Sequence, residues 1–125
     1  MIASSKPKKQ RKFRYAAPMH MRQRFVNAHI SKELKEKLGI AKRSIEIRKG
    51  DSVKVVSGGQ KGKSGKVSEV SIRRGFVYVD GIVRKTAKGK EIMVPIRASN
   101  LYITDLDLSD KYRKESIEGY KKVKQ

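Results

Sequence analysis

The sequence contains no cysteine, few acidic residues and no long apolar run. The absence of cysteine excludes a disulfide framework and a thiolate metal site, and it is compatible with a reducing intracellular compartment. No apolar run approaches the length of a membrane span or of a signal-peptide core. We therefore expect a soluble, unprocessed protein.

The shortage of acidic residues leaves a large positive charge. The chain has 32 Lys and Arg against 12 Asp and Glu, which gives a formal net charge of +20 over 125 residues. Residues 1–50 carry 15 basic and 3 acidic side chains, whereas residues 101–125 carry 6 and 5. Because such an excess destabilises a compact chain by self-repulsion, we expect a permanent polyanionic partner, bound mainly by the N-terminal part.

Residues 49–70 are the most informative segment. Val53 and Val55 alternate with polar residues, as does the run around Val67, which predicts two strands joined by a loop. The loop contains four glycines, which are Gly58, Gly59, Gly62 and Gly65. Glycine permits positive φ and close approach of a partner, and the loop is surrounded by Lys61, Lys63 and Lys66. This pattern favours a binding site for a polyanion.

Short strands and tight turns continue on both sides of this segment. We expect strands at residues 44–48, 66–71, 76–79, 82–85, 91–95 and 101–104. This spacing is typical of a small barrel. The side chains expected inside it are Val53, Val55, Val67, Val70, Val77, Val79, Ile92 and Val94.

Two helices are expected outside the barrel. Ser31 is suited to cap the first helix, and Gly39 is suited to stop it. Ser109 and Asp110 are suited to cap the second, in which Tyr112, Ser116 and Tyr120 share a face. The last residues are expected to fray, because Gly119 and the Lys-rich tail weaken this helix.

The first 32 residues contain no acidic residue. Because Pro7 and Pro18 interrupt an early helix and few apolar side chains are available to bury, we expect an arm that is unfolded when free and ordered on binding. Phe13, Tyr15 and Phe25 lie between arginines, which is suited to stacking on unpaired bases. Docking of the arm onto the barrel is the alternative interpretation, and both can hold.

Residues 49–53 followed by 62–67 resemble the KOW motif, which certain ribosomal proteins and transcription elongation factors share and which adopts a small SH3-like barrel. Residues 11–20, 34–38 and 45–51 are similar to the archaeal and eukaryotic form of one family of large-subunit ribosomal proteins, numbered twenty-four in bacterial and twenty-six in eukaryotic naming. The similarity covers residues 6–115. It departs from the family at Arg97-Ala98, where His-Pro is usual, and retains Ser99-Asn100 as a corner.

The resemblance implies a mainly β fold: a basic arm and short helix over residues 1–43, a KOW SH3-like barrel over 44–108 and a C-terminal helical tail over 109–125. It implies a structural constituent of the large ribosomal subunit in the cytoplasm, without a cofactor. This constituent would bind the 5′ domain of large-subunit ribosomal RNA, assist early assembly and lie near the nascent-chain tunnel exit. The implied partners are this RNA, neighbouring ribosomal proteins and factors at the tunnel exit.

The residues expected to contact RNA lie in the arm, the glycine-rich loop and the basic turns. They are Lys6, Lys8, Lys9, Arg11, Lys12, Arg14, Tyr15, His20, Arg22, Arg24, Lys49, Lys61, Gly62, Lys63, Lys66, Arg73, Arg74, Arg84, Lys85, Lys88, Lys90, Arg97 and Asn100. By the resemblance, the lysines of the motif lie against RNA and residues 11–24 thread between RNA helices.

Enzymatic and metal chemistry find little support. Residues 62–64 resemble the end of a phosphate loop, but the first glycine that such a loop requires is Ser57 here, and a strand pattern follows. His20 and His29 have no carboxylate nearby in the sequence. Helix capping and a solvated face explain the three aspartates near the C-terminal helix, Asp105, Asp107 and Asp110. We expect neither an enzyme nor a metal site.

Two other functions fit part of the pattern. A transcription elongation or general RNA-binding KOW module is disfavoured, because no second globular domain precedes residue 44. A Tudor-like reader of methylated peptides needs an aromatic cage, and the barrel aromatics are too dispersed to form one: Phe76, Tyr78 and Tyr102.

Overall fold

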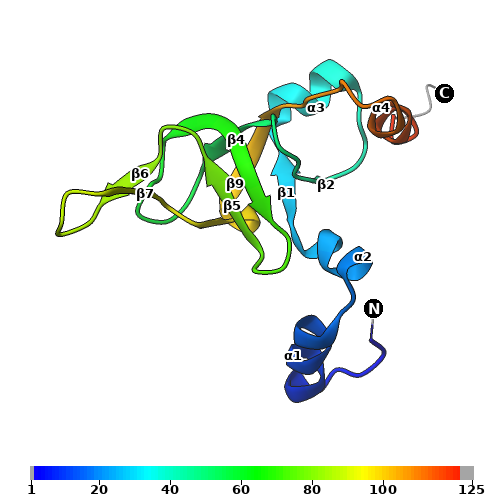
Figure 1. Ribbon diagram of the computed structural model, residues 1–125. Coiled ribbons are helices and arrows are strands. Elements are labelled where there is room, and N and C mark those ends of the chain that lie inside the picture. The colour runs from blue at the N-terminus through cyan, green and yellow to red at the C-terminus, as the bar shows by residue number, and fades with distance from the viewer. Residues whose placement is uncertain (1, 122–125) are drawn as a thin grey trace.

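The computed structural model describes residues 2–121, and its fold is mainly β, as the sequence predicted (Figure 1). Its α-helices are α1 Pro7–Ala16, α2 Met19–Arg22, α3 Lys32–Leu38 and α4 Lys111–Glu118. Its strands are β1 Asn27–Ile30, β2 Ser44–Glu46, β3 Ser52–Val55, β4 Ser64–Ser71, β5 Phe76–Val79, β6 Val83–Lys85, β7 Glu91–Met93, β8 Ile96–Arg97 and β9 Leu101–Asp105. Two 3-10 turns are η1 Gln23–Phe25 and η2 Ala98–Asn100.

Seven strands form one sheet in the order β2-β1-β9-β3-β4-β5-β8, and β6 and β7 form a separate hairpin. Strand β4 pairs with β3 through its first residues and with β5 through its later ones, and the register shifts between Val67 and Glu69. Such a bulge bends a strand, and Figure 1 shows β4 (green) curving across the other strands. The bend gives the sheet the barrel-like form that the sequence predicted.

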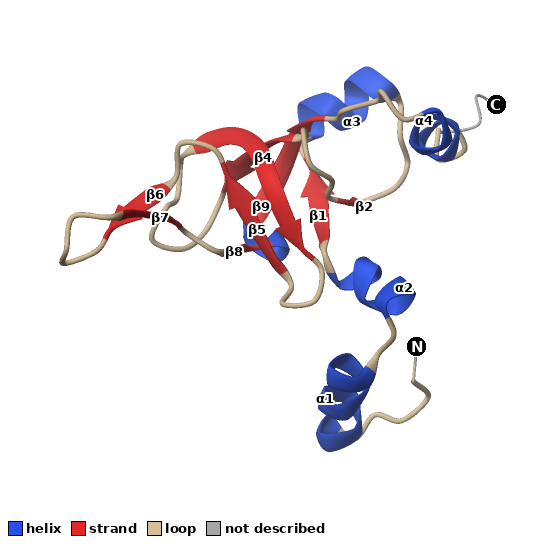
Figure 2. Ribbon diagram, in the orientation of Figure 1, coloured by secondary structure: helices blue, strands red, loops and turns tan. Residues whose placement is uncertain are grey.

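The helices and the β6–β7 hairpin lie around this sheet. Figure 2 shows α1 and α2 extending from one end of it, α3 and α4 beside another, and the hairpin projecting on its own. No helix in residues 2–121 is both long and apolar enough to cross a membrane.

Strand β1 was not predicted. It pairs antiparallel with β2 and parallel with β9, so the C-terminal end of the basic arm belongs to the sheet. Val26, Ala28 and Ile30 are buried at every second position, and this alternation is the sequence signal that could have identified the strand. The arm is therefore anchored by a strand and not only by its charge.

The prediction that the prolines exclude a helix from the arm was wrong, because α1 begins at Pro7. Proline is tolerated at the first helical position, where its N–H would have no partner and its fixed φ suits a helix. Pro18 comes after α1 has ended. No residue of α1 is buried, so this helix forms without contributing to the core.

Most of the predicted core is confirmed. Five of the eight valines and isoleucines expected inside are buried, namely Val53, Val55, Val67, Val77 and Val79. Val70 and Val94 are partly buried and pack against the same core. The prediction was wrong for Ile92, which is 44% exposed. This residue lies in the β6–β7 hairpin, which projects from the barrel, so its side chain has no second layer to cover it.

The predicted N-terminal caps of α3 and α4 and the predicted end of α3 are confirmed, whereas Tyr120, which was predicted to lie within the second helix, follows the end of α4. Ser31 Oγ accepts a hydrogen bond from the Leu34 backbone N–H at 3.3 Å, and Gly39 ends α3 with φ of +63°. Asp110 Oδ1 accepts a hydrogen bond from the Tyr112 backbone N–H at 3.1 Å. Helix α4 ends before Gly119, and the expected fraying of residues 122–125 lies outside the described residues.

Candidate nucleic-acid interface

The glycine-rich loop between β3 and β4 presents lysine side chains, and part of its backbone is already hydrogen-bonded within the protein. The Gly62 N–H donates to Val55 O at 2.9 Å, and the Lys63 N–H donates to Gln60 O at 3.2 Å. These donors are therefore not available to cradle an anion. Lys61 and Lys63 are exposed, so the loop offers the positive charge of their side chains to phosphates.

Glycine is required at two positions of this loop for different structural reasons. Gly62 has a φ of +90° and open space where a Cβ would lie, so the backbone conformation alone requires glycine. A Cβ on Gly65 would lie 2.6 Å from Asp80 O, because β4 and the end of β5 approach closely there. The loop also leads directly into strand β4, so residues 62–64 do not face a helix N-terminus as in a phosphate loop.

The corner at residues 97–100 is built around Asn100. Ser57 Oγ donates to Asn100 Oδ1 at 2.9 Å, and the Val56 N–H donates to Asn100 O at 2.9 Å. The side chain that we predicted to contact RNA thus also holds the glycine-rich loop. Where the family usually has His-Pro, Ala98 is buried and the Arg97 guanidinium lies 5.2 Å from the centre of the Phe76 ring.

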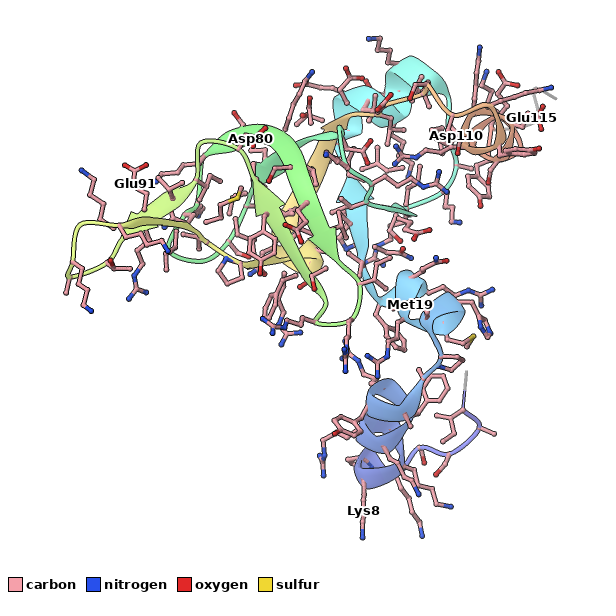
Figure 3. The ribbon with its side chains drawn as sticks, in the orientation of Figure 1. Lys8, Met19, Asp80, Glu91, Asp110 and Glu115 are labelled. Carbon is pink, nitrogen blue, oxygen red and sulfur yellow. The ribbon has the colours of Figure 1, made fainter. Side chains whose placement is uncertain are left out.

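A groove rich in arginine lies between the arm, the β4–β5 turn and the corner at η2. We call it the arginine groove, and its volume is about 1180 Å³. Its lining consists of Arg11, Arg14, Tyr15, Arg22, Phe25, Asn27, Ile72, Arg73, Arg74, Gly75, Arg97, Ala98 and Ser99. Six of these are arginines and none is acidic. Acidic residues lie elsewhere: Figure 3 places Asp80, Glu91, Asp110 and Glu115 on the barrel, the hairpin and α4, away from α1.

Arg22 fixes one wall of this groove. Its Nε donates to Ala17 O at 2.8 Å, one terminal nitrogen donates to Arg73 O at 3.2 Å, and the other donates to Tyr15 O. A single guanidinium therefore joins the end of α1 to the β4–β5 turn. Arg22 was predicted as an RNA contact, and the structure gives it this positioning role within the protein.

The arm aromatics differ in their surroundings, and their contacts with one another lie within the arm rather than against the barrel. The rings of Phe13 and Phe25 meet edge to face with centroids 6.1 Å apart, and the Arg14 guanidinium lies 5.2 Å from the centre of the Phe25 ring. These two rings hold the arm together. Tyr15 is 83% exposed on the groove, so its ring is free to stack on a ligand.

The predicted RNA contacts do not form one surface. The arginine groove brings together seven of them: Arg11, Arg14, Tyr15, Arg22, Arg73, Arg74 and Arg97. Others are exposed around the glycine-rich loop and the adjoining strands, namely Lys49, Lys61, Lys63 and Lys66, or along the β6–β7 hairpin, namely Arg84, Lys85, Lys88 and Lys90. The remaining arm residues are exposed outside the groove: Lys6, Lys8, Lys9, Lys12, His20 and Arg24. Figure 3 shows Lys8 at the far end of α1.

Sequence reasoning missed a buried ion pair beneath the motif. Asp51 is fully buried and Arg113 is 5% exposed, and their side chains form two contacts of 2.6 Å. Arg113 also donates to Asp107 O at 3.0 Å and to Glu46 O at 3.1 Å. The carboxylate of Asp51 additionally accepts the Arg48 and Asp107 backbone N–H groups, each at 3.0 Å. This network attaches α4 to the KOW segment.

The aspartates near α4 act within the protein. Ser109 donates to the Asp107 carboxylate through its backbone N–H, and the hydrogen bonds from Ser109 lower the pKa of Asp107 from 3.8, with smaller contributions from the charges of Arg113 and Lys66. Asp110 caps α4. Within residues 2–121, no three His, Cys, Asp or Glu side chains are grouped so that they could hold a metal ion.

Comparison with known proteins agrees with the resemblance seen in the motifs. The family model that describes ribosomal protein L26 of eukaryotes and its archaeal form, L24, matches residues 4–120. The large ribosomal subunit protein uL24 of Methanocella arvoryzae is 48% identical over 118 residues, which are 94% of each chain. The uL24 protein of Sulfolobus acidocaldarius is 44% identical over 99% of this chain and 91% of its own. That of Saccharolobus solfataricus is 44% identical over 97% of this chain and 100% of its own. The chain therefore belongs to the family of ribosomal proteins that comprises eukaryotic L26 and archaeal L24.

Proposed function

We propose that this chain binds the 5′ domain of large-subunit ribosomal RNA through the arginine groove. Its family consists of structural ribosomal components and not of enzymes, and its relatives are named as proteins of the large ribosomal subunit. The observation that carries the RNA-binding proposal is the lining of the groove, with six arginines, no acidic residue and the exposed Tyr15. The chain would act in cytoplasmic ribosomes.

The chemistry of the groove suits a folded RNA strand. A guanidinium can donate two parallel hydrogen bonds to one phosphate, and each neutralised phosphate releases counterions, which adds a salt-dependent gain in affinity. The ring of Tyr15 can stack on an unpaired base. Because Arg22 holds α1 against the β4–β5 turn, arginines from distant parts of the chain are positioned before RNA arrives.

The other basic surfaces extend this contact. The lysines of the glycine-rich loop and the projecting β6–β7 hairpin are exposed on other parts of the barrel, so a single folded RNA could be held at several points. Binding at several points would lower the repulsion between RNA helices, which is the physical basis for a role in early assembly. By family resemblance, the site of binding lies near the nascent-chain tunnel exit, beside neighbouring ribosomal proteins and factors that act there.

The test is binding to a 5′-domain RNA fragment and to an unrelated structured RNA of equal length, across a salt series. A groove variant replaces Arg11, Arg14, Arg73 and Arg74 with Gln, and leaves Arg22 intact because it holds the arm. The control removes the same charge from exposed lysines outside the groove: Lys32, Lys37, Lys111 and Lys114.

We expect the wild type to prefer the 5′-domain fragment at moderate salt. The groove variant should bind this fragment more weakly, with a log–log salt slope that is shallower by about 0.7–0.9 for each phosphate that the variant no longer neutralises. The control should change affinity much less. Equal binding of both RNAs that disappears with salt would overturn the proposal and leave a general cationic KOW module.

A further inference from the structure

A second groove lies between α4 and the β1–β2 edge of the sheet. We call it the α4 groove, and its volume is about 570 Å³. Arg24, Lys42 and Arg48 supply basic side chains to its lining, and Tyr112 and Tyr120 supply aromatic rings. Of these five residues, only Arg24 was predicted as an RNA contact. The groove therefore combines cations and exposed aromatic surface at a place that the sequence motifs did not indicate.

The side chains of the two tyrosines in this groove differ in how firmly neighbouring groups hold them. Lys42 Nζ lies 3.9 Å from the centre of the Tyr120 ring, and Ser116 Oγ lies 3.3 Å from the Tyr120 hydroxyl, so this ring is fixed as part of the wall. Tyr112 lies in the first turn of α4 and is 80% exposed. An aromatic ring so exposed at the edge of a basic groove is suited to stacking on a base.

The charge of the groove favours an anionic ligand. Four of its lining side chains are basic and Glu46 is the acidic one. Two of the basic side chains are already paired, since Arg113 binds Asp51 and Arg48 binds Asp110 at 2.8 Å. The attraction for phosphate therefore rests on Arg24 and Lys42.

The α4 groove and the arginine groove share one lining residue. Asn27 lines both of them, and the chain passes from Arg22 in the arginine groove to Arg24 in the α4 groove within three residues. Asn27 pairs with Glu46 across β1 and β2, so an RNA strand that leaves the arginine groove past Asn27 would enter the α4 groove beside the one acidic residue of its lining.

We propose that the α4 groove binds a single-stranded segment of RNA, with phosphate on Arg24 and Lys42 and a base stacked on Tyr112. This inference rests on the proposed function, because the segment continues the strand held in the arginine groove. The polar, cationic lining and the shared residue Asn27 favour RNA over an acidic peptide.

The experiment measures binding of the full chain to the 5′-domain fragment and to a single-stranded oligoribonucleotide, for three pairs of variants. The stacking pair is Tyr112→Ala with Tyr112→Phe as the conservative form, and the exposed Tyr102→Ala serves as the matched control. The charge variant combines Arg24→Gln with Lys42→Gln. Its control combines Lys111→Gln with Lys114→Gln on α4. The reference pair is Arg11→Gln with Arg14→Gln in the arginine groove. Thermal unfolding checks that each variant is folded.

We expect Tyr112→Ala to weaken binding severalfold or more with an unchanged salt slope, and Tyr112→Phe to restore affinity, because stacking needs the ring and not the hydroxyl. The Arg24 and Lys42 variant should reduce the salt slope on single-stranded RNA by about 0.7 for each phosphate that is no longer neutralised. The matched controls should behave as the wild type.

The outcomes separate this inference from the proposed function. If the arginine-groove pair weakens binding and the α4-groove variants match their controls, the inference is overturned while the proposed function stands. If neither set of variants changes affinity, both are overturned. If Tyr112→Ala leaves RNA binding intact but abolishes binding of a polyglutamate peptide, the groove belongs to an acidic protein partner and the inference is again overturned.

Discussion

Asp51 and Arg113 form a two-contact ion pair inside the protein, with both nitrogen–oxygen distances at 2.6 Å, although 62 positions separate them in the chain. Asp51 belongs to the KOW segment and Arg113 to α4. Both side chains also form hydrogen bonds to the backbone. Asp51 accepts from the Arg48 and Asp107 N–H groups, and Arg113 donates to the carbonyl oxygens of Asp107 and Glu46. The pair thus sets where α4 lies, and Arg113 forms part of the lining of the α4 groove.

We expect Arg113→Ala to destabilise the protein by about 3–5 kcal/mol, because it leaves the Asp51 carboxylate buried without its partner. Arg113→Lys should restore only part of this loss, since an ammonium group cannot form the same two parallel contacts. The measurement is urea unfolding at neutral pH. The matched control is Arg48→Ala, which breaks the exposed pair with Asp110 and should cost no more than about 1 kcal/mol. Equal effects of Arg113→Ala and Arg48→Ala would contradict the role of the buried pair.

Three glycines near the motif should respond differently to alanine. Gly65→Ala places a Cβ 2.6 Å from the backbone oxygen of Asp80, so we expect a loss of about 1–3 kcal/mol from overpacking. Gly62→Ala meets open space but keeps a φ of +90°, which should cost about 1–2 kcal/mol. Gly59→Ala has neither constraint and should stay within about 0.5 kcal/mol of the wild type. Thermal unfolding of the three variants measures this order, and a destabilised Gly59 variant would show that the loop has another constraint.

Loss of Arg22 should release α1 from the barrel. The Arg22 side chain makes three hydrogen bonds that join Tyr15, Ala17 and Arg73, and no residue of α1 is buried. A helix of this length is marginal without tertiary contacts, so Arg22→Ala should accelerate amide exchange in residues 7–16 on the order of tenfold. Hydrogen–deuterium exchange measures this, with Arg24→Ala as the control. Unchanged exchange in the Arg22 variant would mean that other contacts hold the arm.

The pKa of Asp107 predicts a change in stability at acid pH. Hydrogen bonds from Ser109, assisted by the charges of Arg113 and Lys66, lower this pKa from 3.8. Because the folded pKa lies below the unfolded value, the ionised carboxylate stabilises the fold above about pH 4, and this contribution is lost as pH falls through the folded pKa.

Asp107→Asn should therefore be less stable than the wild type at neutral pH, and the difference should shrink as pH falls from about 4 toward the folded pKa. Urea unfolding over this range measures the effect. Glu115→Gln, an exposed change on α4, gives the background. A difference that stays constant down to the lowest pH would show that Asp107 acts through its shape and not through its charge.

Much of the barrel could be predicted because its signals are local. Alternation identified the strands around Val53, Val77 and Leu101, and the caps at Ser31 and Asp110 mark both predicted helices. Ile92 was misplaced because alternation shows which side chains share a face and not whether another layer covers that face. The KOW segment and the arm motif also identified the family.

Other features depend on which distant segments meet. The parallel pairing of β1 with β9 joins His29 to Tyr102, and no local pattern specifies such a pairing. The helix at Pro7 was rejected on a rule that holds in helix interiors but not at the first position. The division into arm, barrel and tail stays an interpretation, since strand β1 ties the arm into the sheet.

By itself, the sequence determined the charge, the β-rich pattern, the helix caps and the family, because each of these depends on residues that are near one another in the chain or on a total over it. Only the tertiary structure decided which cations act together. Arg11, Arg74 and Arg97 line one groove while Lys88 lies on a separate hairpin, because the bend in β4 and the pairing of β1 bring some distant segments together and leave others apart. The same folding buries Arg113 against Asp51, which turns one basic residue of a highly basic chain into part of its core.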